Sequence, residues 1–191
     1  MLVLLAGVAG AGKNTVQREL MKRNKNIVAI PSYTTREQRP GDIPGETYNF
    51  VSKEEFESMI EKGEFYEYDV HHNNYYGTSK KILSDKVKEG KVIVKDIDVN
   101  GVENLVKLLK NDVKIVTIFL RVPKNILIQR LKNRVDKPSE DEIEMRISRL
   151  EYEESKMGEY DYMIKNNSLE KTVEVIEQII KSEYNIREVE F

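Results

Sequence analysis

The chain has 191 residues, enough for one domain with a sizeable core or one core that carries inserted lobes. Its 31 basic residues nearly balance its 33 acidic ones, so it lacks the strong basic excess typical of nucleic-acid binding. Cysteine is absent, which excludes disulfides and thiolate chemistry and fits a cytoplasmic location. The first apolar run, residues 1–7, is too short to cross a bilayer and follows no basic segment. We therefore expect no signal peptide and no membrane partner.

Short apolar runs and amphipathic segments alternate along most of the chain. Residues 2–6 are typical of a strand buried on both faces, and residues 13–23 follow with apolar positions at helical spacing. The alternation returns later and predicts strands at 91–97, 114–120 and 161–165, and helices at 99–110, 123–133, 139–157 and 168–181. Ser139 and Glu142 form the capping box of the third of these helices. The pattern predicts an α/β fold with a parallel sheet and helices on both faces.

Residues 31–80 interrupt this alternation and are rich in Tyr, Thr, Gly and Pro. Short strands are expected at 48–51 and 64–71, and Ser52 with Glu55 caps a short helix between them. We interpret residues 32–80 as a small mixed α+β lobe inserted into a core of residues 1–31 and 81–191.

A glycine-rich loop joins the first strand to the first helix and matches G-x-x-x-x-G-K. In this pattern backbone N–H groups and the helix N-terminus surround phosphates, and the lysine reaches the β- and γ-phosphates. The alternative is a turn with a surface lysine, but the strand before and the helix after it favour phosphate binding. The candidate phosphate-binding residues are Gly7, Val8, Ala9, Gly10, Ala11, Gly12 and Lys13.

One position departs from this pattern. The residue after the lysine is normally Ser or Thr, whose hydroxyl helps to hold Mg²⁺, but here it is Asn14, followed by Thr15. An amide oxygen can bind Mg²⁺ directly or through water. Asp96, at the end of the apolar run 92–94, is a third candidate for contact with the metal through water.

The inserted lobe carries side chains suited to an anion. Arg36 and Arg39 stand three positions apart beside a Pro-Gly turn, and arginine matches phosphate geometry. Tyr48 and Tyr76 add hydroxyl donors. Taken singly, the arginines could equally belong to a solvated loop and the tyrosines to a small aromatic core.

Taken together, six motifs closely resemble the guanylate kinase family over essentially the whole chain. They are TTRxxRxG at 34–41, GETYNFVS at 45–52, GEFYE at 63–67, NYYGT at 74–78, DIDVxG at 96–101 and EYDYMIKNN at 159–167. The resemblance implies a P-loop kinase core, a GMP-binding lobe and a short lid at about residues 130–146. It also implies transfer of the γ-phosphoryl of ATP to GMP, giving ADP and GDP, with Mg²⁺ as cofactor.

The family's functional residues carry over position by position. The resemblance implies that the phosphate of GMP is bound by Arg36, Arg39, Tyr48 and Tyr76, and its guanine by Ser32, Glu67, Thr78 and Asp98. It implies that ATP is bound by residues 7–13 with Asn14, Thr15 and Asn166. It implies that the transferred group is contacted by Lys13, Arg36, Arg130, Arg134 and Arg146.

The chemistry of guanine agrees with this division. Guanine presents N1–H and an N2 amino group, and the Glu67 carboxylate can accept from both. Adenine lacks this pair, so it would leave the charge unpaired, which can cost roughly 10⁴-fold in specificity. Ser32 or Thr78 can donate to guanine O6.

Several residues fall outside this account. Val135 and Pro138 depart from the family's lid, and Lys95 interrupts an apolar strand without explanation. Arg149 is expected on a solvated helix face, and neighbouring His71 and His72 point to opposite faces of a strand, which disfavours a shared metal.

Two other functions remain open. One is a guanylate-kinase-like module that binds phosphorylated peptides, which the retained glycine loop disfavours. The other is a related kinase with a sugar bisphosphate acceptor, for which Glu67, Asp98 and Ser32 would have no use.

Overall fold

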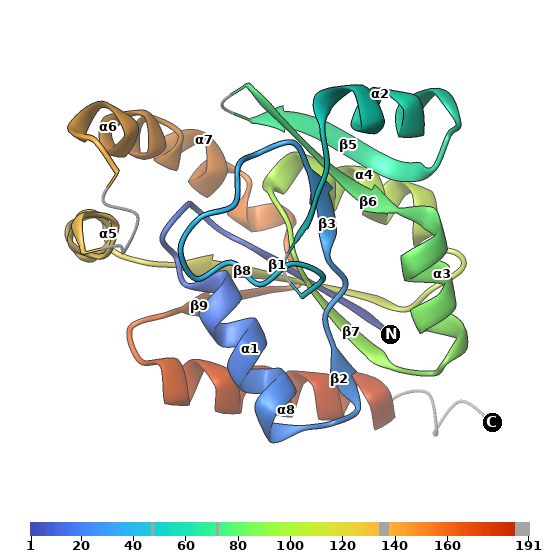
Figure 1. The fold of residues 1–191 in the computed structure, drawn as a ribbon. Coiled ribbons are helices and arrows are strands. Elements are labelled where there is room, and N and C mark those ends of the chain that lie inside the picture. Colours follow the sequence, from blue (N-terminus) through green and yellow to red (C-terminus); the bar gives the residue numbers. More distant parts are fainter. Residues whose placement is uncertain (47, 72, 134–137, 186–191) are drawn as a thin grey trace.

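The computed structural model describes residues 1–46, 48–71, 73–133 and 138–185 (Figure 1). Its centre is a sheet with strand order β2-β7-β1-β8-β9, in which each neighbouring pair runs parallel. The strands are β1 (Leu2–Ala6), β2 (Ile27–Val28), β7 (Val92–Asp96), β8 (Ile115–Arg121) and β9 (Tyr162–Lys165). The predicted parallel α/β fold is therefore confirmed.

Helices cover both faces of this sheet. Along β1, Val3 and Leu5 point into one core while Leu2 and Leu4 point into the other, and all four are 0% exposed. The first core receives apolar side chains from α1 (Lys13–Arg23) and α8 (Leu169–Asn185), seen below the sheet in Figure 1. The second receives them from α3 (Lys80–Lys88) and α4 (Val99–Leu109). A strand covered on both faces is apolar at every position, as the sequence indicated.

A second sheet occupies the interrupted region, with strand order β4-β3-β6-β5. Its strands are β3 (Ser32–Thr34), β4 (Tyr48–Phe50), β5 (Phe65–His71) and β6 (Asn74–Ser79); β3 and β4 run parallel and the other neighbours antiparallel. Helix α2 (Lys53–Glu61) inserts Phe56, which stacks on Phe65 at a centroid distance of 4.5 Å. This sheet has its own aromatic core beside the central sheet.

The remaining helices follow β8 along the chain. They are α5 (Lys124–Lys132), α6 (Glu140–Ser148), α7 (Leu150–Ser155) and a short 3-10 helix, η1 (Met157–Glu159). The prediction of one continuous helix over residues 139–157 is wrong. The structure divides this segment at Arg149 into α6 and α7, and a 3-10 turn follows α7. Both predicted capping boxes, at Ser52 and Ser139, are confirmed. Elements β2, β3, β6 and α3 were not predicted.

Within the described ranges, no helix is both long and apolar enough to span a membrane.

Candidate active site

The glycine loop leaves β1 and enters α1 in a conformation that needs its glycines. Gly10 and Gly12 have φ of +90° and +91°, in the left-handed region. A Cβ on Gly7 would collide with the backbone oxygen of Leu120. Lys13 begins α1, its Nζ donates to the Gly7 oxygen at 2.5 Å, and it lies 3.6 Å from Asp96 Oδ1. The loop is thus wrapped around its lysine at the carboxyl ends of β1 and β7, where parallel sheets place ligands.

Two predicted residues hold this loop from behind. Asn166 is 4% exposed, and its Nδ2 donates to the Ala11 oxygen at 2.6 Å while its Oδ1 accepts from Thr172 at 2.9 Å. Arg130 donates to the Asn166 backbone oxygen at 2.8 Å and to the Ala11 oxygen at 3.4 Å. Both side chains therefore tie the loop to β9 and α5.

The loop opens into a cavity of about 650 Å³. Its lining combines the loop with residues from other parts of the chain, and all of them are predicted site residues except Asp42 and Leu169: Ala9, Gly10, Gly12, Lys13, Asn14, Thr15, Arg36, Arg39, Asp42, Tyr48, Tyr76, Asp96, Arg130, Arg146, Asn166 and Leu169. We name it the phosphate cavity, because five cationic side chains and the glycine loop line it.

Arg36 is fixed in this cavity by a carboxylate that sequence reasoning missed. Its guanidinium donates to Asp42 Oδ2 at 2.9 Å and to the Glu37 oxygen at 2.6 Å, and lies 5.1 Å from the centroid of the Tyr48 ring. Asp42 also accepts from the backbone N–H of Arg39 at 2.8 Å. Burial favours the neutral form of Arg36, but the hydrogen bond and charge of Asp42 outweigh it and raise its pKa. The Pro-Gly-Asp turn was the only available signal.

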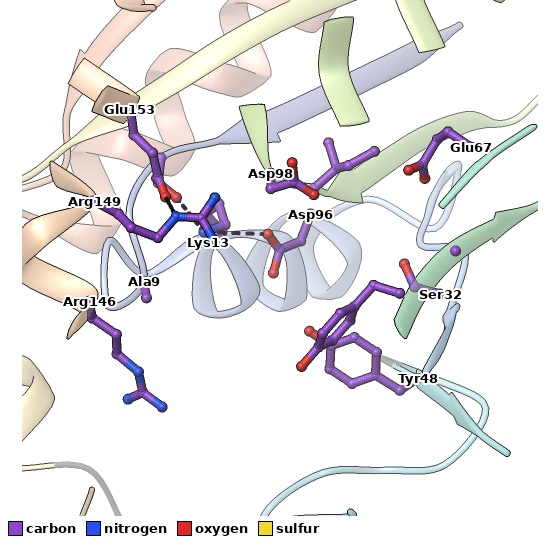
Figure 2. Close-up of a pocket in the computed structure, with 14 residues that line it drawn as sticks. Ala9, Lys13, Ser32, Tyr48, Glu67, Asp96, Asp98, Arg146, Arg149 and Glu153 are labelled. Atoms are coloured by element: carbon purple, nitrogen blue, oxygen red, sulfur yellow. Dashed lines mark hydrogen bonds and ion pairs between the residues drawn. The ribbon is translucent and has the colours of Figure 1, made fainter. Parts of the chain in front are cut away.

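A second cavity, of about 210 Å³, adjoins the first. Its lining contains Gly7, Ala9, Lys13, Ser32, Tyr48, Glu67, Tyr76, Gly77, Asp96, Ile97, Asp98, Arg146, Arg149 and Glu153 (Figure 2). We name it the base cavity. It brings together the predicted residues Ser32, Glu67 and Asp98.

Glu67 is the buried acceptor of the base cavity. It is 8% exposed, and Thr78, 1% exposed on the neighbouring strand, donates its hydroxyl proton to Glu67 Oε1. Burial raises the pKa of Glu67, while the charge of Lys95 and the hydrogen bond from Thr78 oppose the rise. Gly101 of α4 lies against this group, because a Cβ there would sit 3.3 Å from Glu67 Oε2.

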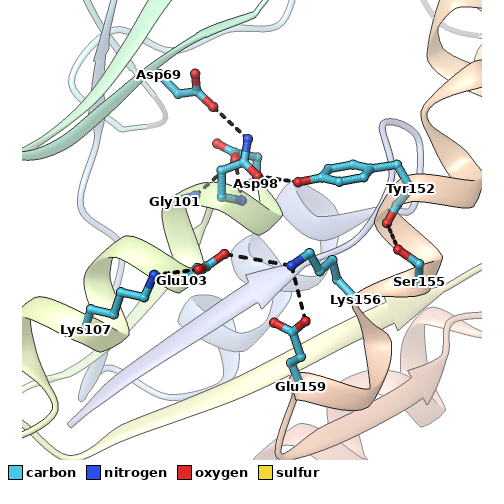
Figure 3. A network of polar contacts seen from close by, with 10 residues as sticks. Asp69, Asp98, Gly101, Glu103, Lys107, Tyr152, Ser155, Lys156 and Glu159 are labelled. Carbon is cyan, nitrogen blue, oxygen red and sulfur yellow. Dashed lines mark hydrogen bonds and ion pairs between the residues drawn. The ribbon is translucent and has the colours of Figure 1, made fainter.

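Asp98 also lines the base cavity and is the N-cap of α4. Its Oδ1 accepts from the backbone N–H groups of Asn100 at 2.9 Å and Gly101 at 3.1 Å. The side chain of Asn100 donates to Asp69 of β5 at 3.1 Å and accepts from Tyr152 of α7 at 2.8 Å (Figure 3). This network joins the second sheet, α4 and α7 around the base cavity.

The two cavities share Ala9, Lys13, Tyr48, Tyr76, Asp96 and Arg146. Arg146 is 6% exposed, and its NH2 lies 4.0 Å from Glu142 Oε1. Arg149, expected on a solvated face, instead lines the base cavity, with its Nε 3.7 Å from Glu153 Oε1. Arg134 and Val135 lie outside the described residues, as does His72. A ligand in one cavity thus meets a ligand in the other beside Lys13 and Arg146.

The lining also fits Mg²⁺, judged by its oxygen atoms. Asn14 Oδ1 is buried and accepts no hydrogen bond. Across the described part of the chain, no three His, Cys, Asp or Glu side chains gather as a metal site. A neutral amide oxygen beside a phosphate-binding loop suits a cation that keeps several waters and takes its other ligands from phosphates.

The first strand of the parallel sheet passes through the glycine loop into α1, and cationic side chains line the cavity at the loop. This arrangement defines a P-loop kinase. The sequence profile described as "Guanylate kinase" matches residues 1–183. The guanylate kinase of Clostridioides difficile (strain 630) is 39% identical over 97% of this chain and 89% of its own length. That of Helicobacter pylori (strain 26695) is 40% identical over 95% of this chain and 86% of its own length.

Solved structures agree with the sequence relatives. The crystal structure of guanylate kinase from Anaplasma phagocytophilum superposes with a TM-score of 0.78 at 29% identity, covering 96% of this chain and 85% of that one. Shikimate kinase from Bacteroides thetaiotaomicron, at 15% identity and a TM-score of 0.53, shares the fold alone. The chain belongs to the guanylate kinase family. It is a nucleoside monophosphate kinase, an ATP:GMP phosphotransferase.

Proposed function

We propose that the phosphate cavity receives the phosphates of ATP, that the base cavity receives the guanine of GMP, and that the γ-phosphoryl group passes between them where the cavities meet. Residues 32–80 then act as the GMP-binding lobe, residues 1–31 and 81–191 as the core, and residues 130–146 as a lid. The observation that carries the proposal is the shared lining at Lys13, Tyr48 and Arg146, with a buried carboxylate on one side and the glycine loop on the other.

Recognition of guanine follows from donors and acceptors in the base cavity. Glu67 accepts from N1–H and the N2 amino group, and the hydroxyl of Thr78 supports its charge. Because the one O–H of Thr78 is already donated to Glu67, Ser32 is the hydroxyl that donates to O6. Asp98 completes the acceptor side.

The phosphate of GMP binds Arg36, Arg39, Tyr48 and Tyr76, which line the phosphate cavity. Burial raises the pKa of Tyr48, so its hydroxyl stays protonated and donates at neutral pH. Asp42, which lines the same cavity, holds Arg36 in place.

Transfer needs alignment and charge neutralisation more than proton chemistry. An oxygen of the GMP phosphate forms a bond to the γ-phosphorus while the bond to the β–γ bridging oxygen breaks, and the acceptor is already an anion. Lys13, Arg36, Arg130 and Arg146 neutralise the developing charge, together with Arg134, and the glycine loop and Asn166 hold ATP.

Mg²⁺ would be held by Asn14 and Thr15, with Asp96 reaching it through water. It would neutralise charge between the β- and γ-phosphates. The buried, unpartnered Oδ1 of Asn14 supports this assignment.

A coupled ADP-release assay with GMP, AMP, CMP and UMP tests the proposal. We expect GMP to be the best acceptor by about 10³-fold or more, because the other bases leave Glu67 unpaired. Equal rates with all four would overturn the assignment of the base cavity. A phosphopeptide-binding module would show no ATP turnover, and a sugar bisphosphate kinase would show turnover only with a non-base acceptor. A cytoplasmic location and the absence of nucleic-acid and membrane partners stay predictions.

A further inference from the structure

Lys95 is a buried lysine in the middle of the central sheet. It lies on β7, paired with Leu4 of β1, and is 1% exposed. Burying an ammonium group is costly unless opposite charges compensate it, and the carboxylates of Glu67, Asp96 and Asp98 supply such charges around Lys95. A strand position that could hold an apolar residue thus carries a cation directed at the base cavity.

Its contact is with a residue of that cavity. Lys95 Nζ donates to Ser32 Oγ at 2.6 Å, and Ser32 lines the base cavity while Lys95 lies covered behind it. An ammonium group has three donors and no acceptor, so the Ser32 hydroxyl cannot donate back to it. The positive charge also repels the hydroxyl proton. The Ser32 O–H therefore points away from Lys95.

The hydroxyl of Thr78, near Ser32, already donates its proton to another residue. Thr78 donates to Glu67 Oε1, so it presents no proton to a base. The cavity is left with a donor at Ser32 beside an acceptor at Glu67. This order matches a purine edge that carries an oxygen at position 6 next to N1–H.

We propose that Lys95 is a positioning residue for the acceptor base: it holds the Ser32 hydroxyl as a proton donor, so that the cavity selects oxygen at position 6 of the purine. The inference rests on the proposed assignment of the base cavity to GMP. Polarisation by the ammonium group also makes the Ser32 O–H a stronger donor than an isolated hydroxyl.

The test uses Lys95→Met, Ser32→Ala and the double variant, with GMP, 6-thio-GMP and IMP as acceptors. Sulfur at position 6 is a weaker acceptor than oxygen, while IMP keeps O6 and N1–H and lacks the N2 amino group. The measured quantity is kcat/KM for each acceptor, with the KM for ATP alongside. Lys81→Met, an exposed lysine on α3, is the matched control.

We expect the wild type to prefer GMP to 6-thio-GMP by about tenfold or more, the effect of one good hydrogen bond to a polarised donor. In each single variant, the kcat/KM for GMP should exceed that for 6-thio-GMP by no more than about threefold. The double variant should reduce this ratio no further. The KM for ATP should stay within about twofold of wild type in every variant, because neither residue lines the phosphate cavity. The GMP:IMP ratio should stay within about twofold of wild type in Ser32→Ala, and this control applies to that variant alone, because Lys95→Met also removes a charge that opposes the rise in the pKa of Glu67.

Several results would overturn the proposal. They are an unchanged GMP:6-thio-GMP ratio in Lys95→Met or in Ser32→Ala, additive losses in the double variant, or a GMP:IMP ratio in Ser32→Ala that shifts as much as its GMP:6-thio-GMP ratio. A thermal melt checks folding, and Lys95→Leu repeats the test if Lys95→Met folds poorly. A wild type that does not use GMP would instead overturn the proposed assignment of the cavity.

Discussion

Glu67 is the residue on which base recognition depends most. Replacing it with Gln keeps its size but places an amide donor opposite the donors of guanine. We expect kcat/KM for GMP to fall by about 10²–10⁴-fold, because a buried site built to accept hydrogen bonds is left mismatched. The KM for ATP should change by less than about twofold, since Glu67 does not line the phosphate cavity. Steady-state kinetics with each substrate varied separately measure both, and equal losses would contradict the assignment.

Gly101 makes room for this carboxylate. A Cβ there would lie 2.6 Å from Ile97 Cδ1 and 3.3 Å from Glu67 Oε2, so Gly101→Ala forces Ile97 or the start of α4 to move. We expect a loss of about 1–2 kcal/mol in stability, the cost of overpacking less the gain in helix propensity. GMP affinity should fall about tenfold if the shift costs the base about one hydrogen bond.

Calorimetric titration and thermal melts measure these two effects. Gly158→Ala is the matched control, because a Cβ there meets no atom within 4 Å. A Gly101→Ala variant that binds GMP like the wild type would show that the base does not approach the start of α4.

Among elements, those with local signals were predictable from sequence. Ser52 and Ser139 marked helix starts through side chains three positions away, and β1 was apolar throughout because it is covered on both faces. The break at Arg149 has no Gly or Pro to mark it, and its backbone is still helical, with φ of −80° and ψ of −13°. Helix α3 is short, and Leu83 is its only buried residue.

Pairing between distant elements was harder to predict. Strands β3 and β4 have three residues each, too few for an alternation pattern, and they pair in parallel across the loop that carries Arg36 and Arg39. The site residues themselves were found through motif order rather than geometry. The contacts of Asp42 with Arg36 and of Lys95 with Ser32 were not predicted. The sequence marked both places, Asp42 by a Pro-Gly turn and Lys95 as a charge in an apolar strand, but neither signal identifies the partner.

The tether between the glycine loop and β9 gives a prediction at this scale. Asn166→Ala removes the hydrogen bond to the Ala11 oxygen and leaves Thr172 without its partner. We expect ATP affinity to fall about tenfold, the effect of losing one or two buried hydrogen bonds. GMP affinity should hold, because the hydrogen bonds of Asn166 join it to Ala11, Arg130 and Thr172, none of which is proposed to bind GMP. Calorimetry with each nucleotide tests this, Asn167→Ala on the exposed side is the control, and a matching loss for GMP would contradict it.

At the scale of the whole molecule, the base cavity should cost stability in a pH-dependent way. Burial raises the pKa of Glu67 above its ordinary value of 4.5. A carboxyl with a raised folded pKa stabilises the fold only while protonated, and that contribution is lost as pH rises through the folded pKa. The native protein therefore carries a penalty at neutral pH that is absent at about pH 4.

Glu67→Gln should remove this penalty while it destroys base recognition. We expect the variant to melt near the wild type at about pH 4 and above it at pH 7 to 8, by about 2–4 °C for each kcal/mol recovered in a chain of this size. Melts across this range measure the difference, with Glu64→Gln, an exposed carboxylate beside β5, as the control. A difference that stays flat or narrows as pH rises would show that Lys95 and Thr78 compensate Glu67 fully. A widening difference would mean that the chain gives up stability to keep a charged acceptor for guanine.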